Sequence, residues 1–255
     1  MQIEADLFVG VDPSGGRKPF TYAAFDHGGK LVALESCEVE DVLAFLSGQP
    51  GALMAVCSPP RPSKGLVRQD DVRQNLPPLR ISGRSLDMRL AEHQLREHGI
   101  NISMTASRKE LCANWVQSGF DFYRRIAALG FQPFSTPDAS HQWMETHPYA
   151  CFCVLLGQNP LQRSTLEGRL QRQLGLYEQG LGIRDPMNFF EEITRHKLFK
   201  GVLPTEQIYT AEELDAIVAA YAAYEAGRHP ERMIKVGDPE EGQIILPVAE
   251  LKAKY

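Results

Sequence analysis

The apolar positions near the N-terminus form short runs separated by turn signals, a pattern typical of strands. Phe8-Val9-Gly10-Val11 leads into Asp12 and stops at Pro13-Ser14-Gly15-Gly16, which breaks a strand. Two further runs, Phe20–Asp26 and Leu31–Leu34, are separated by the tight-turn sequence His27-Gly28-Gly29-Lys30. The pattern predicts three antiparallel strands joined by short turns.

Later apolar runs predict strands of another kind. Ala52–Cys57 is continuously apolar, as in a strand buried on both faces, and His141–Glu145 is predicted as a second late strand. Gly237–Pro247 predicts a turn followed by a short terminal strand. These strands do not follow one another through tight turns, so helices are expected between them.

Helical periodicity and capping signals predict seven helices. Ser85 is a plausible N-cap, Asp185-Pro186 is a strong helix start, and an apolar stripe (Leu111, Trp115, Phe122, Ile126, Leu129) marks the core face of the longest early helix. The predicted ranges are about Glu40–Ser47, Leu86–His98, Arg108–Leu129, Pro148–Leu156, Leu161–Leu176, Asp185–Lys200 and Leu214–Ala226.

The last of these helices has the clearest signals. Thr210-Ala211-Glu212-Glu213 is a capping box, and Gly227 marks the end. The helix is rich in alanine, so we expect it to pack very close to a sheet. Asp215 lies in its first turn.

Strands and helices together predict one α/β domain over residues 1–255, with helices interrupting a mixed sheet. Ser58–Arg80 is rich in Pro, Arg and Gln and is predicted as a long loop, the start of a basic loop and helix insertion around residues 58–130. Between Arg61 and Lys109 there are ten Lys or Arg and five Asp or Glu, a local charge of +5. Such a segment can face phosphate groups, and a solvated surface is the open alternative.

Bulk composition narrows the functional classes. The net charge of −5 argues against a protein that coats nucleic acid indiscriminately. The N-terminal residues carry acids where a signal peptide needs a basic and then an apolar stretch, and no run is long enough for a membrane span. Five cysteines show no zinc-like spacing. We therefore expect a cytoplasmic protein with reduced thiols and no membrane segment; its oligomeric state stays open.

Three carboxylates stand out by their positions. Asp12 ends the first strand, Glu145 ends a later buried strand, and Asp215 starts the alanine-rich helix. If these ends converge at one edge of the sheet, the acids form a cluster that cations must neutralise. Carboxylate oxygens suit Mg²⁺ or Mn²⁺, which can activate water against a phosphodiester. Each acid taken singly is also explained as a turn or helix-start residue.

The order of several short motifs resembles domain-of-unknown-function family 429, described as predicted ribonuclease-H-like nucleases. Similar segments run from about Leu7 to Pro247. The segments that carry the resemblance are Gly10-Val11-Asp12, Gly83-Arg84-Ser85-Leu86-Asp87, Met144-Glu145-Thr146-His147-Pro148, Leu214 to Ala220, and Gly237 to Pro247.

This resemblance implies a ribonuclease-H-like fold, a mixed five-stranded sheet with an antiparallel meander, parallel strands and flanking helices. It implies a divalent-metal-dependent nuclease with Asp12, Glu145 and Asp215 as catalytic residues and ligands of Mg or Mn. Cys57 departs from the family pattern, because an aspartate is expected there. The departure implies one bound ion instead of two, or weak binding.

For a nucleic-acid substrate, Arg84 and Lys64 are the residues expected to meet phosphate. His147 is expected to assist a proton transfer or to orient a ligand, with a solvent-facing histidine at a helix start as the alternative. Two other functions stay open. One is a non-catalytic protein that binds nucleic acid or nucleotide on the same fold. The other is a phosphotransferase like the sugar kinases, suggested by Gly10–Gly16, although no second phosphate loop is present.

Overall fold

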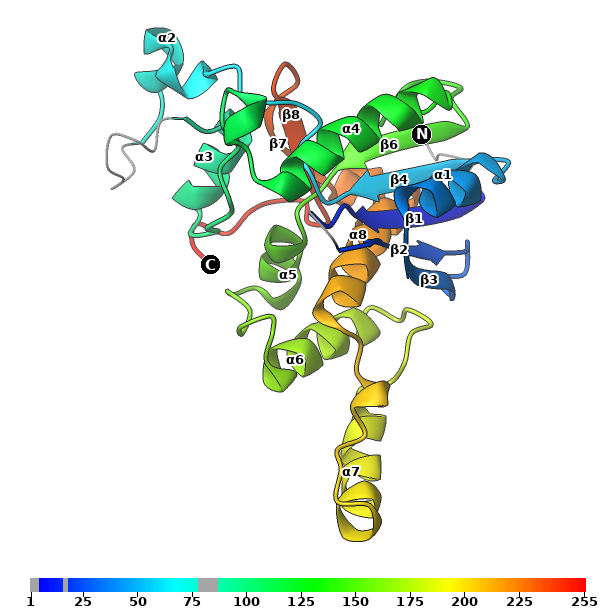
Figure 1. The fold of residues 1–255 in the computed structure, drawn as a ribbon. Helices are drawn as coiled ribbons and strands as arrows, with labels where there is room; N and C mark the ends of the chain where they lie inside the picture. The colour runs from blue at the N-terminus through cyan, green and yellow to red at the C-terminus, as the bar shows by residue number, and fades with distance from the viewer. Residues whose placement is uncertain (1–4, 16–17, 78–86) are drawn as a thin grey trace.

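A single twisted sheet organises the chain, for which a computed structural model describes residues 5–15, 18–77 and 87–255. Among these residues the strand order is β3-β2-β1-β4-β6-β8-β7, and β5 pairs with β6 off this path (Figure 1). The strands are β1 Leu7–Asp12, β2 Phe20–Phe25, β3 Leu31–Cys37, β4 Ala52–Val56, β5 Gln132–Pro133, β6 His141–Glu145, β7 Ile234–Asp238 and β8 Gly242–Leu246.

The pairing directions agree with the predicted mixed sheet. Strands β1, β2 and β3 pair antiparallel, and β4, β6 and β8 continue from β1 in parallel. The sheet is larger than the predicted five strands. The C-terminal segment forms an antiparallel hairpin of β7 and β8 instead of one short strand, and the two-residue strand β5 pairs with β6. Only β8 was expected at the C-terminal end; Ile234–Asp238 is short and stays partly exposed.

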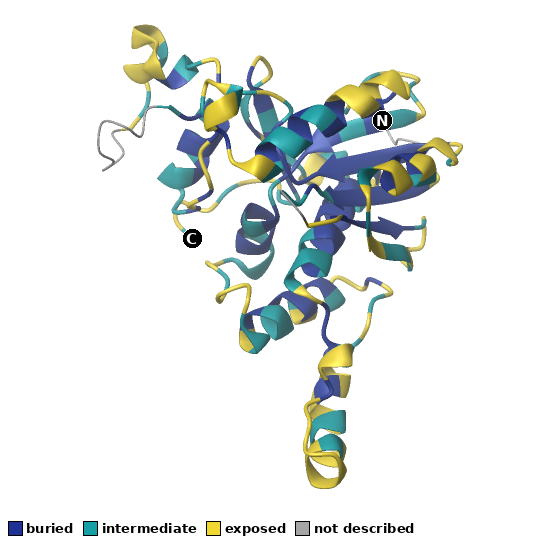
Figure 2. Ribbon diagram, in the orientation of Figure 1, coloured by how far each residue is buried: buried dark blue, intermediate teal, exposed yellow. Residues whose placement is uncertain are grey.

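Eight α-helices lie among the described residues, and they cover both faces of the sheet (Figures 1 and 2). Helix α8 packs on β1, β2 and β4 from one side, whereas α1 and α4 cover the opposite face. The helices are α1 Val39–Ser47, α2 Asp70–Arg73, α3 Leu90–Glu97, α4 Asn114–Ala128, α5 Pro148–Leu156, α6 Leu166–Tyr177, α7 Met187–Phe199 and α8 Ala211–Arg228.

Several predicted helix boundaries are wrong. Helix α3 begins at Leu90, and Ser85, its expected cap, lies outside the described residues. Helix α4 begins at Asn114 after a separate short turn, so Leu111 is 59% exposed instead of contributing to the core stripe. Leu129, at the other end of that stripe, follows the last helical residue and is also exposed.

Helix α7 extends away from the sheet, and Figure 2 shows it mainly as exposed and intermediate surface.

Two further features concern the cysteines and the helix lengths. All five cysteines are free thiols. No helix in the described ranges combines the length and apolar character needed to cross a lipid bilayer.

The contact between β1 and α8 is as close as the alanine-rich sequence predicts. A side chain on Gly10 would place its Cβ 2.1 Å from the carbonyl oxygen of Ala216 and 2.2 Å from the amide nitrogen of Ala220. Both are backbone atoms, which cannot swing away as a flexible side chain can. The approach therefore depends on glycine in the strand and small residues on the helix.

We expect Gly10→Ala to lower the free energy of unfolding by roughly 3 kcal/mol or more, since overpacking against backbone has no cheap relaxation. Gly48→Ala is the matched control, because a Cβ there meets no atom closer than 3.6 Å. Urea unfolding followed by circular dichroism measures both. Equal stability of the two variants would contradict the packing described.

Candidate functional site

Asp12 faces α8 because side chains alternate along β1. Val9 and Val11 belong to the core under α1 and α4, while Phe8 belongs to the core under α8. Gly10 touches α8, and Asp12 is two residues further along the same face. The strand therefore directs this carboxylate toward the N-terminal end of α8, where Asp215 is the fifth residue.

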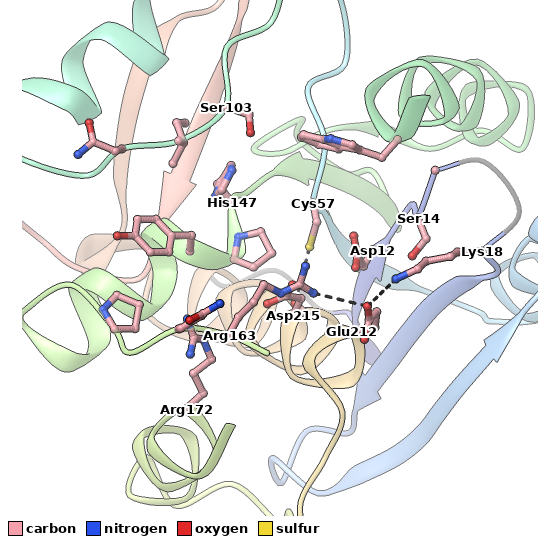
Figure 3. Close-up of a pocket in the computed structure, with 18 of the residues that line it drawn as sticks. Asp12, Ser14, Lys18, Cys57, Ser103, His147, Arg163, Arg172, Glu212 and Asp215 are labelled. Atoms are coloured by element: carbon pink, nitrogen blue, oxygen red, sulfur yellow. Dashed lines mark hydrogen bonds and ion pairs between the residues drawn. The ribbon is translucent and has the colours of Figure 1, made fainter. Parts of the chain in front are cut away.

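Asp12 and Asp215 line the same pocket of about 550 Å³ (Figure 3). The capping box that starts α8 is formed as predicted, with Thr210 Oγ1 accepting from the amide of Glu213 at 3.1 Å. It fixes the helix start, and with it the position of Asp215. The remaining lining residues are Ser14, Gly15, Lys18, Cys57, Asn101, Ile102, Ser103, Trp115, His147, Pro148, Tyr149, Pro160, Leu161, Gln162, Arg163, Arg172 and Glu212.

Cations compensate part of the acidic charge in this pocket. Arg163 Nη2 lies 2.7 Å from Asp215 Oδ2 and 3.9 Å from Glu212 Oε1. Lys18 Nζ lies 3.1 Å from Glu212 Oε1. Arg172 is buried and donates to the backbone carbonyls of Leu161 and Gly168, each at 2.8 Å.

Burial dominates the two central carboxyl groups despite these cations. It raises the pKa of Asp12 to about 6, and Arg163 only partly opposes the effect. Burial also raises the pKa of Asp215 to about 7, and the negative charge of Asp12 adds to the shift. Two carboxyl groups with raised pKa values in one pocket are the pattern of a site that favours an added cation.

Cys57 lies beside this pair. Its amide donates to the Val11 carbonyl at 2.9 Å, and its Sγ is 3.7 Å from the Asp215 carbonyl oxygen. Burial raises the pKa of the thiol well above its ordinary value, with Asp12 and Asp215 adding to the effect. At neutral pH the thiol is protonated, so it carries no charge where the family resemblance implies a carboxylate.

The structure does not bring Glu145 to the other two acids. Glu145 pairs with Val56, and Val56 lies in the core under α1 and α4, so the register directs Glu145 to that face. The residue of this chain segment on the α8 side is Thr146, whose hydroxyl donates to the Ile245 carbonyl at 2.8 Å. A shift of one position along a strand reverses the face, which is why the strand-end argument misplaced this carboxylate.

Glu145 instead forms a buried ion pair with Arg89. The guanidinium donates through Nη1 to Oε2 at 2.8 Å and through Nη2 to Oε1 at 2.5 Å. The same arginine donates through Nε to Glu92 Oε1 at 3.0 Å. Arg89 and Glu145 are only 2% and 3% exposed, so Glu145 has its charge and its geometry already matched within the fold.

The residues predicted to bind substrate have different surroundings. Arg84 lies outside the described residues. Lys64 is exposed and pairs with Glu240 at 3.1 Å, away from the residues that line the pocket. His147 does line the pocket at the start of α5; the residue is half-buried, and its Nδ1 is buried with no hydrogen-bond partner in the described ranges.

Burial, with the charge of Arg89, lowers the pKa of His147 to about 4. The ring is therefore neutral at physiological pH. A neutral imidazole can accept a proton, which keeps a proton-transfer role chemically open.

The sequence argument missed Lys18, Trp115, Arg163 and Glu212, which all line the pocket. Arg163 was placed on a helix from Leu161, but α6 begins at Leu166 and leaves Arg163 in the preceding turn segment, free to reach α8. The sequence could have placed Glu212 at the site, because this residue lies three positions before Asp215 and therefore on the same helix face. Trp115 was assigned to the core stripe.

The donor set suits one divalent cation more than two. Within the described part of the chain, no group of three or more His, Cys, Asp or Glu side chains is arranged to hold a metal ion. Asp12 and Asp215 offer carboxylate oxygens, and Mg²⁺ commonly uses one or two carboxylates with waters and substrate phosphate as its other ligands. The predicted Mg or Mn therefore stays a prediction, with Asp12 and Asp215 as the residues that fit it.

Comparison with known proteins gives one match. The profile of the family described as "Protein of unknown function (DUF429)" matches residues 10–241, which is most of the chain. No curated protein and no solved structure is significantly similar to it.

We expect Glu145→Gln to lower the free energy of unfolding by roughly 3 kcal/mol or more, because it leaves Arg89 buried with its pair disrupted. The control is Lys64→Ala, which removes an exposed pair and should cost about 1 kcal/mol or less. Chemical unfolding measures both. A fully stable Glu145→Gln variant that has lost a metal-dependent property would instead support the original assignment of Glu145 as a ligand.

A second prediction concerns pH. Asp12 has a higher pKa when folded than its ordinary value of 3.8, so the folded state holds its proton to higher pH and this residue's contribution to stability falls as pH rises from about 4 to about 7. His147 acts in the opposite direction, since its lowered pKa of about 4 makes stability rise with pH up to about 6.5.

The comparison of wild type with Asp12→Asn isolates the first contribution. In the absence of metal, the free energy of unfolding of the variant, relative to that of the wild type, should increase by up to roughly 3 kcal/mol as pH rises from about 4 to about 8. Urea unfolding in EDTA across this range measures the difference. A difference that does not change with pH would show that Asp12 titrates normally.

Proposed function

The chain belongs to the DUF429 family, and we propose that it is a metal-dependent phosphodiester hydrolase whose reaction centre is the Asp12–Asp215 pair. The observation that supports this most is the pair itself, two largely buried carboxyl groups with raised pKa values in one pocket. Such an arrangement is unfavourable without positive charge near it. A divalent cation supplies that charge and brings its own affinity for phosphate oxygens.

The charges of the pocket fit this assignment. Three acids, Asp12, Glu212 and Asp215, lie with three cations, Lys18, Arg163 and Arg172, so the formal charges are equal in number, yet burial still raises the pKa of Asp12 and Asp215. One bound Mg²⁺ or Mn²⁺ would add two positive charges. With the ion bound, the pocket would carry a net positive charge and attract an anion such as a phosphodiester.

Secondary structure supports the same proposal. The path β3-β2-β1-β4-β6 consists of three antiparallel strands followed by two parallel ones, the arrangement implied by a ribonuclease-H-like fold. Asp12 ends the first strand of that path, and α8 lies on its face. The β8–β7 hairpin is an addition to this arrangement.

Each residue has a distinct role in this proposal. Asp12 and Asp215 would hold the ion, which activates water and polarises the phosphate when bound. Arg163 and Lys18 would orient the phosphate, and each must exchange part of its present ion pair for it. His147, neutral and lining the pocket, would orient a ligand, since a pKa of about 4 makes it a weak proton acceptor at neutral pH. Cys57 offers a sulfur in place of a carboxylate oxygen, a poor match for Mg²⁺, so the centre would hold one ion.

A non-catalytic nucleic-acid or nucleotide-binding protein is the second candidate. The observation that favours it is the 2.7 Å contact of Arg163 with Asp215, which already occupies one of the two proposed ligands. In that case the pocket would bind an anion through Arg163 and Lys18, without a metal. A sugar-kinase-like phosphotransferase has less support, because the described strands form one sheet and not two related halves.

Manganese binding separates the two candidates. We expect Mn²⁺ to bind with a stoichiometry of one, and Asp12→Asn and Asp215→Asn to weaken it more than roughly 10-fold, since loss of even an outer partner of a ligand costs about that much. Asp121→Asn is the control, an exposed carboxylate paired with Lys109 and Arg124. Electron paramagnetic resonance of free Mn²⁺ gives the affinities.

Cleavage of single-stranded, duplex and hybrid substrates is measured with the same proteins. Activity that requires Mn²⁺ or Mg²⁺ and disappears in both aspartate variants supports the hydrolase. Tight binding of these substrates in EDTA, with unchanged behaviour of both variants, would overturn it and favour the binding protein.

A further inference from the structure

The pocket has two chemically different sides. Charged side chains gather around Asp12 and Asp215, as Figure 3 shows. The remaining lining is mixed: polar residues alternate there with six apolar or aromatic ones, Ile102, Trp115, Pro148, Tyr149, Pro160 and Leu161. A ligand that satisfies both sides needs an anionic part and a flat apolar part.

Trp115 is held close to the reaction centre by its backbone. It lies in the first turn of α4, and the loop that follows β1 packs directly against that turn. A Cβ on Gly15 would lie 2.4 Å from the Trp115 amide nitrogen, so only glycine permits this approach. The backbone of Trp115 is thus held against the segment that carries Asp12, three residues before Gly15.

The side chain of Trp115 is only partly buried in the core. It packs at the edge of a small apolar cluster of Cys112, Val116 and Phe120 and remains half-buried, while it also lines the pocket. A partly exposed indole in a pocket offers a flat surface for stacking, which any nucleobase can use. Polar groups on Asn101, Ser103 and Gln162 line the same space and can meet the edge of a base.

The starts of three helices also meet at this pocket. Trp115 is in the first turn of α4, Pro148 and Tyr149 begin α5, and Glu212 and Asp215 are in the first turns of α8. Each helix start carries partial positive charge that favours an anion nearby. The start of α8 lies among the charged residues, so with Arg163 and Lys18 it favours phosphate beside Asp215 and leaves the indole of Trp115 for the base.

We propose that the pocket takes a single unpaired nucleotide, its phosphate at the Asp12–Asp215 centre and its base stacked on Trp115. The phosphate end rests on the proposed function, whereas the base end rests on the aromatic side of the pocket. A cavity of about 550 Å³ has the size of a small-molecule site and not of a groove that follows a duplex. A free nucleotide and an unpaired nucleotide of a single strand share the required chemistry.

Tryptophan fluorescence tests the base end without catalysis. The chain has two tryptophans, and Trp143→Phe leaves Trp115 as the only reporter. Trp143 is in β6 on the α4 side, so its conservative replacement leaves the pocket lining unchanged. Nucleoside monophosphates, in Mn²⁺ and in EDTA, should quench the remaining emission saturably, and ribose phosphate should not.

Affinity is then measured by calorimetry in the otherwise unaltered chain. Trp115→Leu should weaken nucleoside monophosphate binding by roughly 10-fold or more, the range expected for loss of one stacked base. Trp115→Phe should retain most of the affinity, while ribose phosphate should bind all three proteins equally. A single-stranded oligonucleotide that competes better than its duplex identifies the strand as the source; competition by monophosphates alone identifies the free nucleotide.

Two results would overturn the proposal: no quenching by any nucleoside monophosphate, or equal affinity of wild type and Trp115→Leu. The proposed hydrolase fails separately. If nucleotides quench Trp115 but Mn²⁺ does not bind and nothing is cleaved, the base site stands without the metal centre. If metal-dependent cleavage persists unchanged in Trp115→Leu, the hydrolase stands and the base site does not.

Discussion

The close packing of α8 on β1 determines the rest of the site. With no side chain on Gly10, the helix backbone at Ala216 and Ala220 lies against the strand. The same approach brings the first turn of α8 beside the end of β1, so Asp12 and Asp215 share a pocket. Partial burial of both carboxyl groups raises their pKa values, which links a packing constraint to the electrostatics of the site.

Successive side chains of a strand point to opposite faces of the sheet. Two sets of charged residues that look alike in the sequence therefore lie on different faces. On the α8 face, Asp12 lies near Asp215 with incomplete compensation. On the opposite face, Glu145 has a complete partner in Arg89. A buried carboxylate with two charge-assisted hydrogen bonds belongs to the scaffold, whereas a pair that repels is poised to bind a cation or a proton.

The sequence allowed much of the fold to be predicted, because the signals involved were local. The capping box before α8 and the apolar run that became β4 were recognised for this reason. The β7–β8 hairpin was only half predicted, and Glu145 was assigned to the wrong face, because both depend on pairing between segments far apart in the chain. Arg163 lies within the range predicted as a helix from Leu161 to Leu176, yet its contact with Asp215 depends on where α6 begins. That boundary has no strong local signal.

The account is tested most directly by the position of manganese in a crystal of the protein, located by its anomalous scattering. It predicts a single ion bound by Asp12 and Asp215, with Arg163 displaced from its present contact and with Glu145 still paired to Arg89. An ion bound by Glu145, or a crystal soaked to saturation with no ion at Asp12 and Asp215, would contradict it.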